Sequence, residues 1–206
     1  AVPRRFLEGT ESAVKEAFEV ALKTLAEAGC VIDDLDIPEL SYAAMTSMIT
    51  SSAESAGINR RWFRERHQDF VPHVARGLAV GMTITASEYL TVQRARHRIR
   101  EALHQAYKKI DLIVSPTTPR VAPPISDGVR GNGDNTHHAS NNHSNLLRFP
   151  SMLGLPGCSV PCGMTPDEMP IGMQLIGSWF SDQTVLNAGL AYQSLTDWHR
   201  QKPLVD

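Results

Sequence analysis

The sequence has no long apolar run and very little cysteine. No stretch approaches the roughly 18 consecutive apolar residues of a transmembrane helix, and no segment near the start has the pattern of a signal peptide. Only three of the 206 residues are cysteines, too few for the disulfide framework of a small secreted domain. We therefore expect a cytoplasmic protein with no membrane partner.

The cysteines form no evident redox pair. Cys158 and Cys162 lie four residues apart in a segment that we expect to be extended, which separates them by about 13 Å at ~3.3 Å per residue. A disulfide requires Cα atoms within about 7 Å of each other. We interpret both as small buried apolar side chains.

No charge of one sign dominates, since Lys and Arg number 20, Asp and Glu number 22, and the net charge is -2. Binding of nucleic acid requires a clear basic surplus, so we expect no nucleic-acid partner. Glu88 and Glu101 flank the densest basic cluster within helical reach. We interpret the cluster as a solvated or salt-bridged helix face, with phosphate binding as the alternative. Its members are Arg94, Arg96, His97, Arg98 and Arg100.

The early part of the chain predicts a strand, a helix and a second strand. Apolar residues recur at helical spacing between Thr10 and Gly29, and Gly29 is a typical stop. The flanking segments 2–7 and 30–38 have the composition of strands. Short links between such elements give a βαβ-like unit, which favours a sheet covered by helices.

The middle of the chain continues this alternation. A segment rich in Met, Ser and Ala predicts a closely packed helix over about 41–56. The capping-box pattern from Thr85 to Glu88 predicts the start of a long helix that runs to about residue 110. Residues 111–114 then predict a short strand, and Ser115-Pro116-Thr117-Thr118-Pro119 follows at its carboxyl end, where ligand-binding loops lie in open α/β sheets.

The segment 126–145 is dominated by Gly, Asn, Asp, Ser and His, and it predicts one long polar loop. His137, His138 and His143 invite comparison with a metal site. Adjacent histidines usually point apart, however, and the nearby Asp134 lacks the supporting residues that orient metal ligands. We interpret the segment as a polar loop, with a substrate-facing lid and a metal site as alternatives.

The last third predicts two strands, over 154–163 and 170–177, followed by a helix over 181–198 with Ser181 as its cap. An isolated hairpin is only marginally stable, so we expect this helix to cover it. The expected buried side of the helix consists of Val185, Leu186, Ala188, Gly189, Leu190, Tyr192 and Leu195.

The order of these motifs resembles the C-terminal half of amidase signature enzymes. The resemblance is carried by Asp111-Leu-Ile-Val-Ser-Pro-Thr-Thr-Pro119, Gly154-Leu-Pro-Gly-Cys-Ser-Val-Pro-Cys-Gly163 and Pro170-Ile-Gly-Met-Gln-Leu-Ile-Gly177. It spans nearly the whole chain and implies an α/β fold, the C-terminal portion of the amidase-signature fold, with a mixed β-sheet flanked by helices. We expect residues 1–206 to form a single domain or part of one.

The resemblance implies amide hydrolysis by a serine nucleophile, activated by a second serine on a cis peptide and by a lysine, without a metal or other cofactor. In the family these residues lie in the N-terminal half. Serine needs such an adjacent base, and the oxyanion needs preorganised N–H donors. No Gly-Gly-Ser-Ser or Gly-x-Ser-x-Gly pattern occurs here, and Ser51-Ser52 falls in a predicted helix. We therefore assign no catalytic residue and expect this chain alone to be inactive.

What the resemblance does imply for this chain is a wall of the substrate pocket. The corresponding segments of relatives shape the acyl or leaving-group site, which makes Thr117, Thr118, Asn145 and Ser151 the candidate substrate-binding residues. Many relatives carry Asn where Ser151 stands here, which is a departure from the family pattern.

The chain opens with Ala1 rather than Met, and Val2-Pro3-Arg4 resembles the segment that follows the signature region. We expect a piece of a longer amidase acting on a small-molecule amide; removal of an initiator Met is the alternative. Alternative functions are the A-subunit-like part of a glutamyl-tRNA amidotransferase and a non-catalytic binding or scaffold protein. Exposed strand edges would lead to self-association or homo-oligomers.

Overall fold

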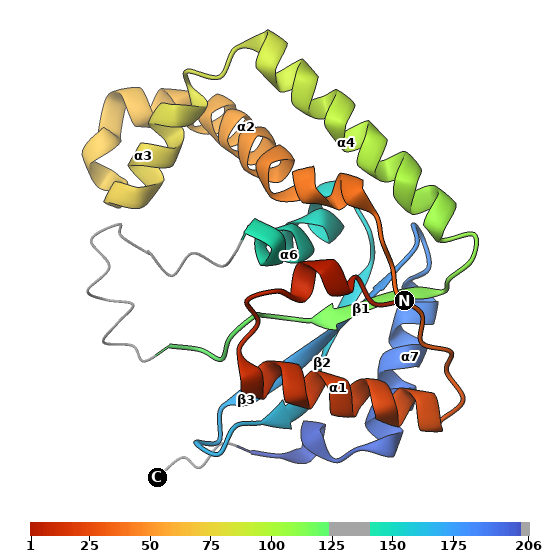
Figure 1. Cartoon of the computed structure of the whole chain (residues 1–206). Coiled ribbons are helices and arrows are strands. Elements are labelled where there is room, and N and C mark those ends of the chain that lie inside the picture. Colours follow the sequence, from red (N-terminus) through yellow and green to blue (C-terminus); the bar gives the residue numbers. More distant parts are fainter. Residues whose placement is uncertain (124–140, 203–206) are drawn as a thin grey trace.

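The computed structural model describes residues 1–123 and 141–202 and places a small sheet between two groups of helices (Figure 1). The strands are β1 (Leu112–Pro116), β2 (Gly157–Met164) and β3 (Pro170–Gly177). The helices are α1 (Ser12–Glu27), α2 (Ala43–Arg66), α3 (Pro72–Gly81), α4 (Ala86–Ala106), α6 (Asn141–Leu153) and α7 (Asp182–Leu195). Short 3-10 helices are η1 (Arg4–Leu7), η2 (Pro38–Tyr42), η3 (His67–Asp69) and η4 (Trp198–Arg200).

The three strands form an antiparallel sheet in the order β1-β3-β2. The hairpin of β2 and β3 confirms the prediction for the last third of the chain. β1 pairs with the other edge of β3, with Leu112 opposite Gly177 and Pro116 opposite Met173. The central strand therefore joins two parts of the sequence that are far apart.

The amino-terminal residues extend the sheet with parallel contacts. The Ala1 amino group donates to the Leu112 carbonyl oxygen at 2.7 Å, and the Val114 N–H donates to the Ala1 carbonyl oxygen at 2.9 Å. Val2 in turn forms a parallel bridge with Asp34. The paired strands β1, β2 and β3 are all antiparallel, so these parallel contacts are the only trace, among the described residues, of the mixed sheet that the sequence predicts.

The two strands predicted over 2–7 and 30–38 are much shorter than expected, because the contact between Val2 and Asp34 is an isolated bridge. Asp is a poor strand former, and three aspartates lie between residues 33 and 36. α1 still connects the two parallel segments, so the βαβ-like connection is present in reduced form.

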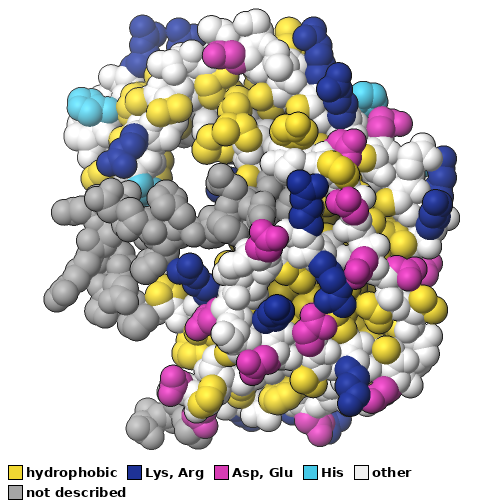
Figure 2. Space-filling view, viewed as in Figure 1, with side chains coloured by type: hydrophobic (Ala, Val, Ile, Leu, Met, Phe, Trp, Pro, Cys, Tyr) yellow, Lys and Arg dark blue, Asp and Glu magenta, His cyan; other side chains and the backbone are white. Residues whose placement is uncertain are grey.

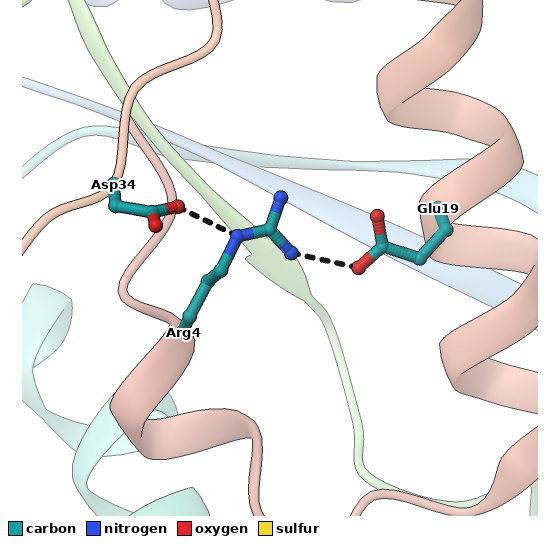
Figure 3. Close-up of polar contacts among 3 residues, drawn as sticks. All are labelled: Arg4, Glu19 and Asp34. Atoms are coloured by element: carbon teal, nitrogen blue, oxygen red, sulfur yellow. Dashed lines mark hydrogen bonds and ion pairs between the residues drawn. The ribbon is translucent and has the colours of Figure 1, made fainter.

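Arg4 links the three parts of this unit (Figure 3). Its Nε donates to Asp34 Oδ1 at 2.6 Å, and its Nη1 donates to Glu19 Oε1 on α1 at 2.8 Å. The hydrogen bonds to Asp34 and then to Glu19 raise the pKa of the guanidinium above its ordinary value. The forked guanidinium can serve two carboxylates at once, which a lysine ammonium does less well.

Each face of the sheet packs against its own helices. α1 and α7 contact one face, and α6 with α4 and η2 cover part of the other (Figure 1). Neighbouring strand residues alternate between the two: Val114 and Leu175 belong to the first apolar cluster, whereas Ile113 and Ile176 belong to the second. This alternation follows from the two-residue period of a strand.

Several predicted boundaries are confirmed. α1 ends just before Gly29, which adopts a φ of +96°, in the left-handed region that favours glycine. α4 begins with a capping box in which the Thr85 side chain accepts from the Glu88 N–H and the Glu88 carboxylate accepts from the Thr85 N–H. Within α4, Val92, Ile99 and Leu103 are buried.

The prediction for α2 needs correction. α2 continues to Arg66, ten residues beyond the predicted end, because the following segment is also compatible with a helix. Its methionines were expected to pack closely, yet Met45 is 57% and Met48 48% exposed.

α7 covers the hairpin as expected, through Val185, Gly189 and Tyr192. Leu186, Leu190 and Leu195 were expected on the same buried side but are mostly exposed. Seven apolar positions are more than one face of a helix can bury. Ser181 is not a side-chain cap, since its hydroxyl donates to the Ser178 carbonyl oxygen instead.

The basic face of α4 is solvated rather than salt-bridged, because within the described ranges no ion pair joins its cluster to Glu88 or Glu101. The Arg100 guanidinium instead lies over the Trp179 ring, 4.9 Å from its centroid. α6 starts at Asn141, so 141–145 are helical rather than part of the predicted loop, and 126–140 lie outside the described residues. No helix in the described ranges is long and apolar enough to span a membrane.

Candidate functional site

Polar side chains gather on one face of the sheet, beyond the apolar contact of Ile113 with α4 and α6. Ser115 is two residues further along β1 than Ile113, and Thr117 two further again, so all three lie on the same face. The backbone N–H of Thr117 donates to the Gly172 carbonyl oxygen at 2.8 Å, which continues the pairing with β3 past the end of β1. This face therefore changes from apolar to polar along one strand.

Thr117 reaches across the central strand to Ser159 of β2. The two hydroxyl oxygens lie 2.6 Å apart. Between them stands Gly172, where a Cβ would lie 2.9 Å from Thr117 Oγ1 and 3.1 Å from Ser159 Oγ. A side chain at this position would thus crowd the contact, and glycine allows the two hydroxyls to meet.

Gln174 completes the group. It is opposite Ser115 on one side and opposite Ser159 on the other in the strand register. Its side-chain nitrogen lies 3.4 Å from the fully buried Ser115 hydroxyl, in donor geometry. We call Ser115, Thr117, Ser159 and Gln174 the sheet-face polar cluster. Ser159 is exposed and Gln174 and Thr117 are half-buried, so part of the cluster is open to a ligand.

The four candidate substrate-binding residues are not all brought together. Thr118 is exposed, and its hydroxyl donates to the Arg120 carbonyl oxygen at 2.8 Å, within the turn. Ser151 is exposed on α6, and its hydroxyl donates to the Arg148 carbonyl oxygen at 3.2 Å. The backbone of Asn145 lies in α6, but its side chain lies outside the described residues. Of the three candidates whose side chains are described, only Thr117 joins the sheet-face polar cluster.

Sequence reasoning missed Ser115, Ser159 and Gln174. A signal was present, because Thr117 lies two residues after Ser115 and Gln174 two residues after Gly172, and residues two apart along an extended segment share a face. The register that places Ser159 opposite Gln174 depends on strand pairing, which the sequence alone did not reveal.

The buried titratable groups near the sheet are poor nucleophiles. Burial raises the pKa of the Cys162 thiol to about 12. Burial, and then the nearby Cys162, raise the pKa of Tyr192 to about 12. Tyr107, whose hydroxyl donates to the Ile176 carbonyl oxygen, also has a raised pKa because it is buried. Each of these groups is protonated near neutral pH, and the thiolate is the reactive form of cysteine.

No serine is paired with a lysine in the part of the chain that the structure describes. The lysines of this part are exposed, and those with a side-chain partner contact Glu27 (Lys23) or Gln105 (Lys108). The Ser51 hydroxyl donates to the Met48 carbonyl oxygen within α2. Across the same residues, no three His, Cys, Asp or Glu side chains are arranged to hold a metal; His137, His138 and the side chain of His143 lie outside them.

The sheet-face polar cluster can therefore orient a polar ligand but has no base to activate a hydroxyl. Four hollows on the described surface are lined by other residues, and none includes Thr117, Thr118 or Ser151. Within the described residues, the cluster forms an accessible face, because Ser159 is exposed and Thr117 and Gln174 are half-buried.

Comparison with known proteins connects this arrangement to a family. The Amidase family model matches residues 1–186. The glutamyl-tRNA(Gln) amidotransferase A subunit from Thermosynechococcus vestitus is 30% identical over 95% of this chain and 45% of its own length. The protein of the same name from Chloroflexus aurantiacus is 32% identical over 98% of this chain and 45% of its own length. The chain thus spans less than half the length of these curated relatives.

Comparison of the fold with solved structures leads to the same family. A crystal structure of an amidase superposes with a TM-score of 0.78 at 25% identity, covering 94% of this chain and 44% of the other. The fold of this chain, a sheet between helices in which β2 and β3 form an antiparallel hairpin, is thus shared with an amidase of known structure. The chain belongs to the Amidase family.

Proposed function

We propose that this chain is the C-terminal portion of a serine amidohydrolase that cleaves carboxylic amide bonds. The observation that carries the proposal is the sheet-face polar cluster in a chain of the Amidase family. An amide substrate offers one acceptor and one or two donors, and hydroxyls and a carboxamide can match both kinds of group. Thr117, Ser159 and Gln174 would form one wall of the substrate pocket.

The nucleophilic serine, its activating serine and the lysine would come from an N-terminal half outside these residues. The coverage of 45% of the curated relatives is compatible with this division. So is the position of the described lysines, which are exposed and apart from any serine-rich glycine loop. The chain on its own would then be inactive.

The surface of α2 also supports a larger enzyme. Four large apolar side chains of this helix are at least 48% exposed: Met45, Met48, Ile58 and Trp62. Figure 2 shows apolar side chains gathered over the part of the molecule where α2 lies. Exposed apolar surface of this kind commonly marks an interface, and we propose that the N-terminal half covers it.

The test compares this chain with a chain extended by the residues encoded upstream of Ala1. Ammonia release from small amides should stay at background for the 206-residue chain and rise well above it for the extended one. Amide turnover by the shorter chain, or none by the extended chain on any amide of a broad panel, would refute the proposal. The second result would favour a non-catalytic binding or scaffold protein.

Within the extended enzyme, Thr117→Val should lower kcat/KM by about tenfold, because one hydrogen bond to a polar substrate group is lost. Thr184→Val provides a matched control, since Thr184 is an exposed residue of α7 away from the sheet face. Equal effects of the two substitutions would show that the sheet-face polar cluster does not contact substrate.

A second candidate is the A-subunit-like part of a glutamyl-tRNA amidotransferase, which would add ammonia transfer and partner subunits. The names of the curated relatives at 30% and 32% identity favour it. In that case the extended chain should release ammonia from glutamine and should do so faster when the other subunits and tRNA are added. A rate unchanged by these additions would favour the free-standing amidohydrolase.

A further inference from the structure

A groove on the helical side of the molecule is lined by three arginines from two walls. Arg94 and Arg98 lie one turn apart on α4, and Arg5 belongs to η1. The hollow has a volume of about 680 Å³, within the range of ~300–1,000 Å³ of small-molecule sites. It lies apart from the sheet-face polar cluster, none of whose members lines it.

The positive charges in this groove are largely uncompensated. Glu39 is the single acidic residue among those that line it. Arg5 has one distant ion pair, with Asp36 at 3.8 Å. Arg94 and Arg98 have no ion pair with any residue in the ranges 1–123 and 141–202. The lining residues thus carry two positive charges in excess.

The remaining lining residues offer a surface for the body of a ligand. The Tyr42 side chain is 62% exposed, and Pro38 and Ala95 add apolar area. The Ser41 hydroxyl already donates to the Pro38 carbonyl oxygen, but its oxygen can still accept a hydrogen bond. An aromatic ring beside guanidinium groups suits a planar or apolar body attached to an anion.

We propose that this groove binds a small organic phosphate. Guanidinium groups bind phosphate oxygens in a forked geometry, and a phosphate monoester carries a charge of about -1.5 to -2 near neutral pH, enough to engage both Arg94 and Arg98, which have no ion pair among the described residues. A carboxylate offers only one charge and two oxygens. A nucleic-acid strand is a poorer match, because the chain has a net charge of -2 and the basic residues line a hollow.

Phenyl phosphate is the probe, titrated into the 206-residue chain by calorimetry. We expect saturable binding at one site, and a loss of affinity of at least about tenfold in Arg94→Gln with Arg98→Gln, because two charge-assisted contacts are removed. Arg60→Gln with Arg64→Gln is the matched control. These two residues have the same spacing and charge on α2 but line a different hollow, and their replacement should leave affinity unchanged.

Two further arms define the ligand class. Tyr42→Ala should weaken phenyl phosphate and leave inorganic phosphate unchanged, and benzoate should bind at least about tenfold more weakly than phenyl phosphate. Absence of saturable binding, equal losses in the two arginine pairs, or equally tight binding of benzoate would overturn the proposal. The proposal would also be overturned if the parent chain bound heparin but not phenyl phosphate, and the Arg94→Gln with Arg98→Gln variant no longer bound heparin. Circular dichroism verifies that each variant is folded.

Discussion

The hydroxyl oxygens of Thr117 and Ser159 lie 2.6 Å apart, although 42 positions separate the two residues in the sequence. Their contact crosses the central strand above Gly172. The end of β1 and the middle of β2 are therefore coupled through a residue that has no side chain.

Replacing Gly172 with alanine should break this coupling. The added methyl group would crowd both hydroxyls, and overpacking of this kind costs about 1–3 kcal/mol. Urea unfolding measures the loss. Gly57→Ala is the control, because a methyl group there meets nothing within 4 Å on the helix α2 and should stabilise by about 0.5–1 kcal/mol. A Gly172 variant as stable as the parent would show that the sheet tolerates a side chain at this position.

The capping box of α4 should make stability depend on pH. Hydrogen bonds from the Thr85 backbone and side chain lower the pKa of Glu88 below its ordinary value of 4.5. A carboxylate whose pKa is lower in the folded state stabilises the fold above the unfolded pKa, and this contribution is lost as the pH falls through the folded pKa. The thermal midpoint of the parent should exceed that of Glu88→Gln near neutral pH, and the difference should shrink below pH 4.5.

Glu101→Gln serves as the control for this titration, since Glu101 lies on the same helix and is exposed. Its replacement removes the same charge from the same helix without touching the cap, so the midpoint near neutral pH should fall less than in Glu88→Gln. A difference between parent and Glu88→Gln that stays constant down to acid pH would contradict the role of the carboxylate.

The thiols of Cys30 and Cys162 should react with a disulfide reagent at very different rates. Cys30 is exposed, whereas Cys162 is buried and has a pKa raised to about 12. Because the thiolate is the nucleophile, Cys162 should react only when the protein unfolds. Colour release from an aromatic disulfide should show a fast phase that Cys30→Ser abolishes and Cys162→Ser leaves unchanged. Rapid modification of Cys162 in the native chain would show that this face of the sheet opens easily.

The exposed apolar face of α2 should lead the chain to self-associate. Sedimentation should give a mass above 22.7 kDa that rises with concentration. Met48→Lys with Trp62→Lys should lower this tendency, because the two charges would have to be desolvated in an interface. The same charges at Thr184 and Ala191, exposed residues of α7, should have little effect. A monomer at all concentrations would rule out association through α2.

The sequence predicted most where a local signal was strong. Gly29 ended α1, and the pair Thr85 and Glu88 started α4, because each signal acts within one helical turn. The hairpin of β2 and β3 followed from two apolar segments around a polar turn. Local chemistry decides such boundaries without help from the rest of the fold.

Features that depend on contacts between distant residues could not be predicted from the sequence. Leu186 and Leu190 fit the helical spacing of α7 as well as Val185 does, and only the packed structure shows which of them face the sheet. Of the candidate site residues, Thr117 lies in the sheet-face polar cluster, while Ser151 bonds within its own helix. Ser159 could not be placed beside Thr117 without the register of three strands.

The strand order β1-β3-β2 bears on how the chain tolerates insertions. Backbone hydrogen bonds pair Leu112–Pro116 with Met173–Gly177. These bonds set the register of the two strands, whatever the number of residues between the two segments. Closing a flexible connection of twice the length costs only about 0.6 kcal/mol more. Length changes between Thr118 and α6 should therefore leave the spacing of Ser115, Thr117 and Gln174 intact, so this part of the sequence can vary in length at little thermodynamic cost.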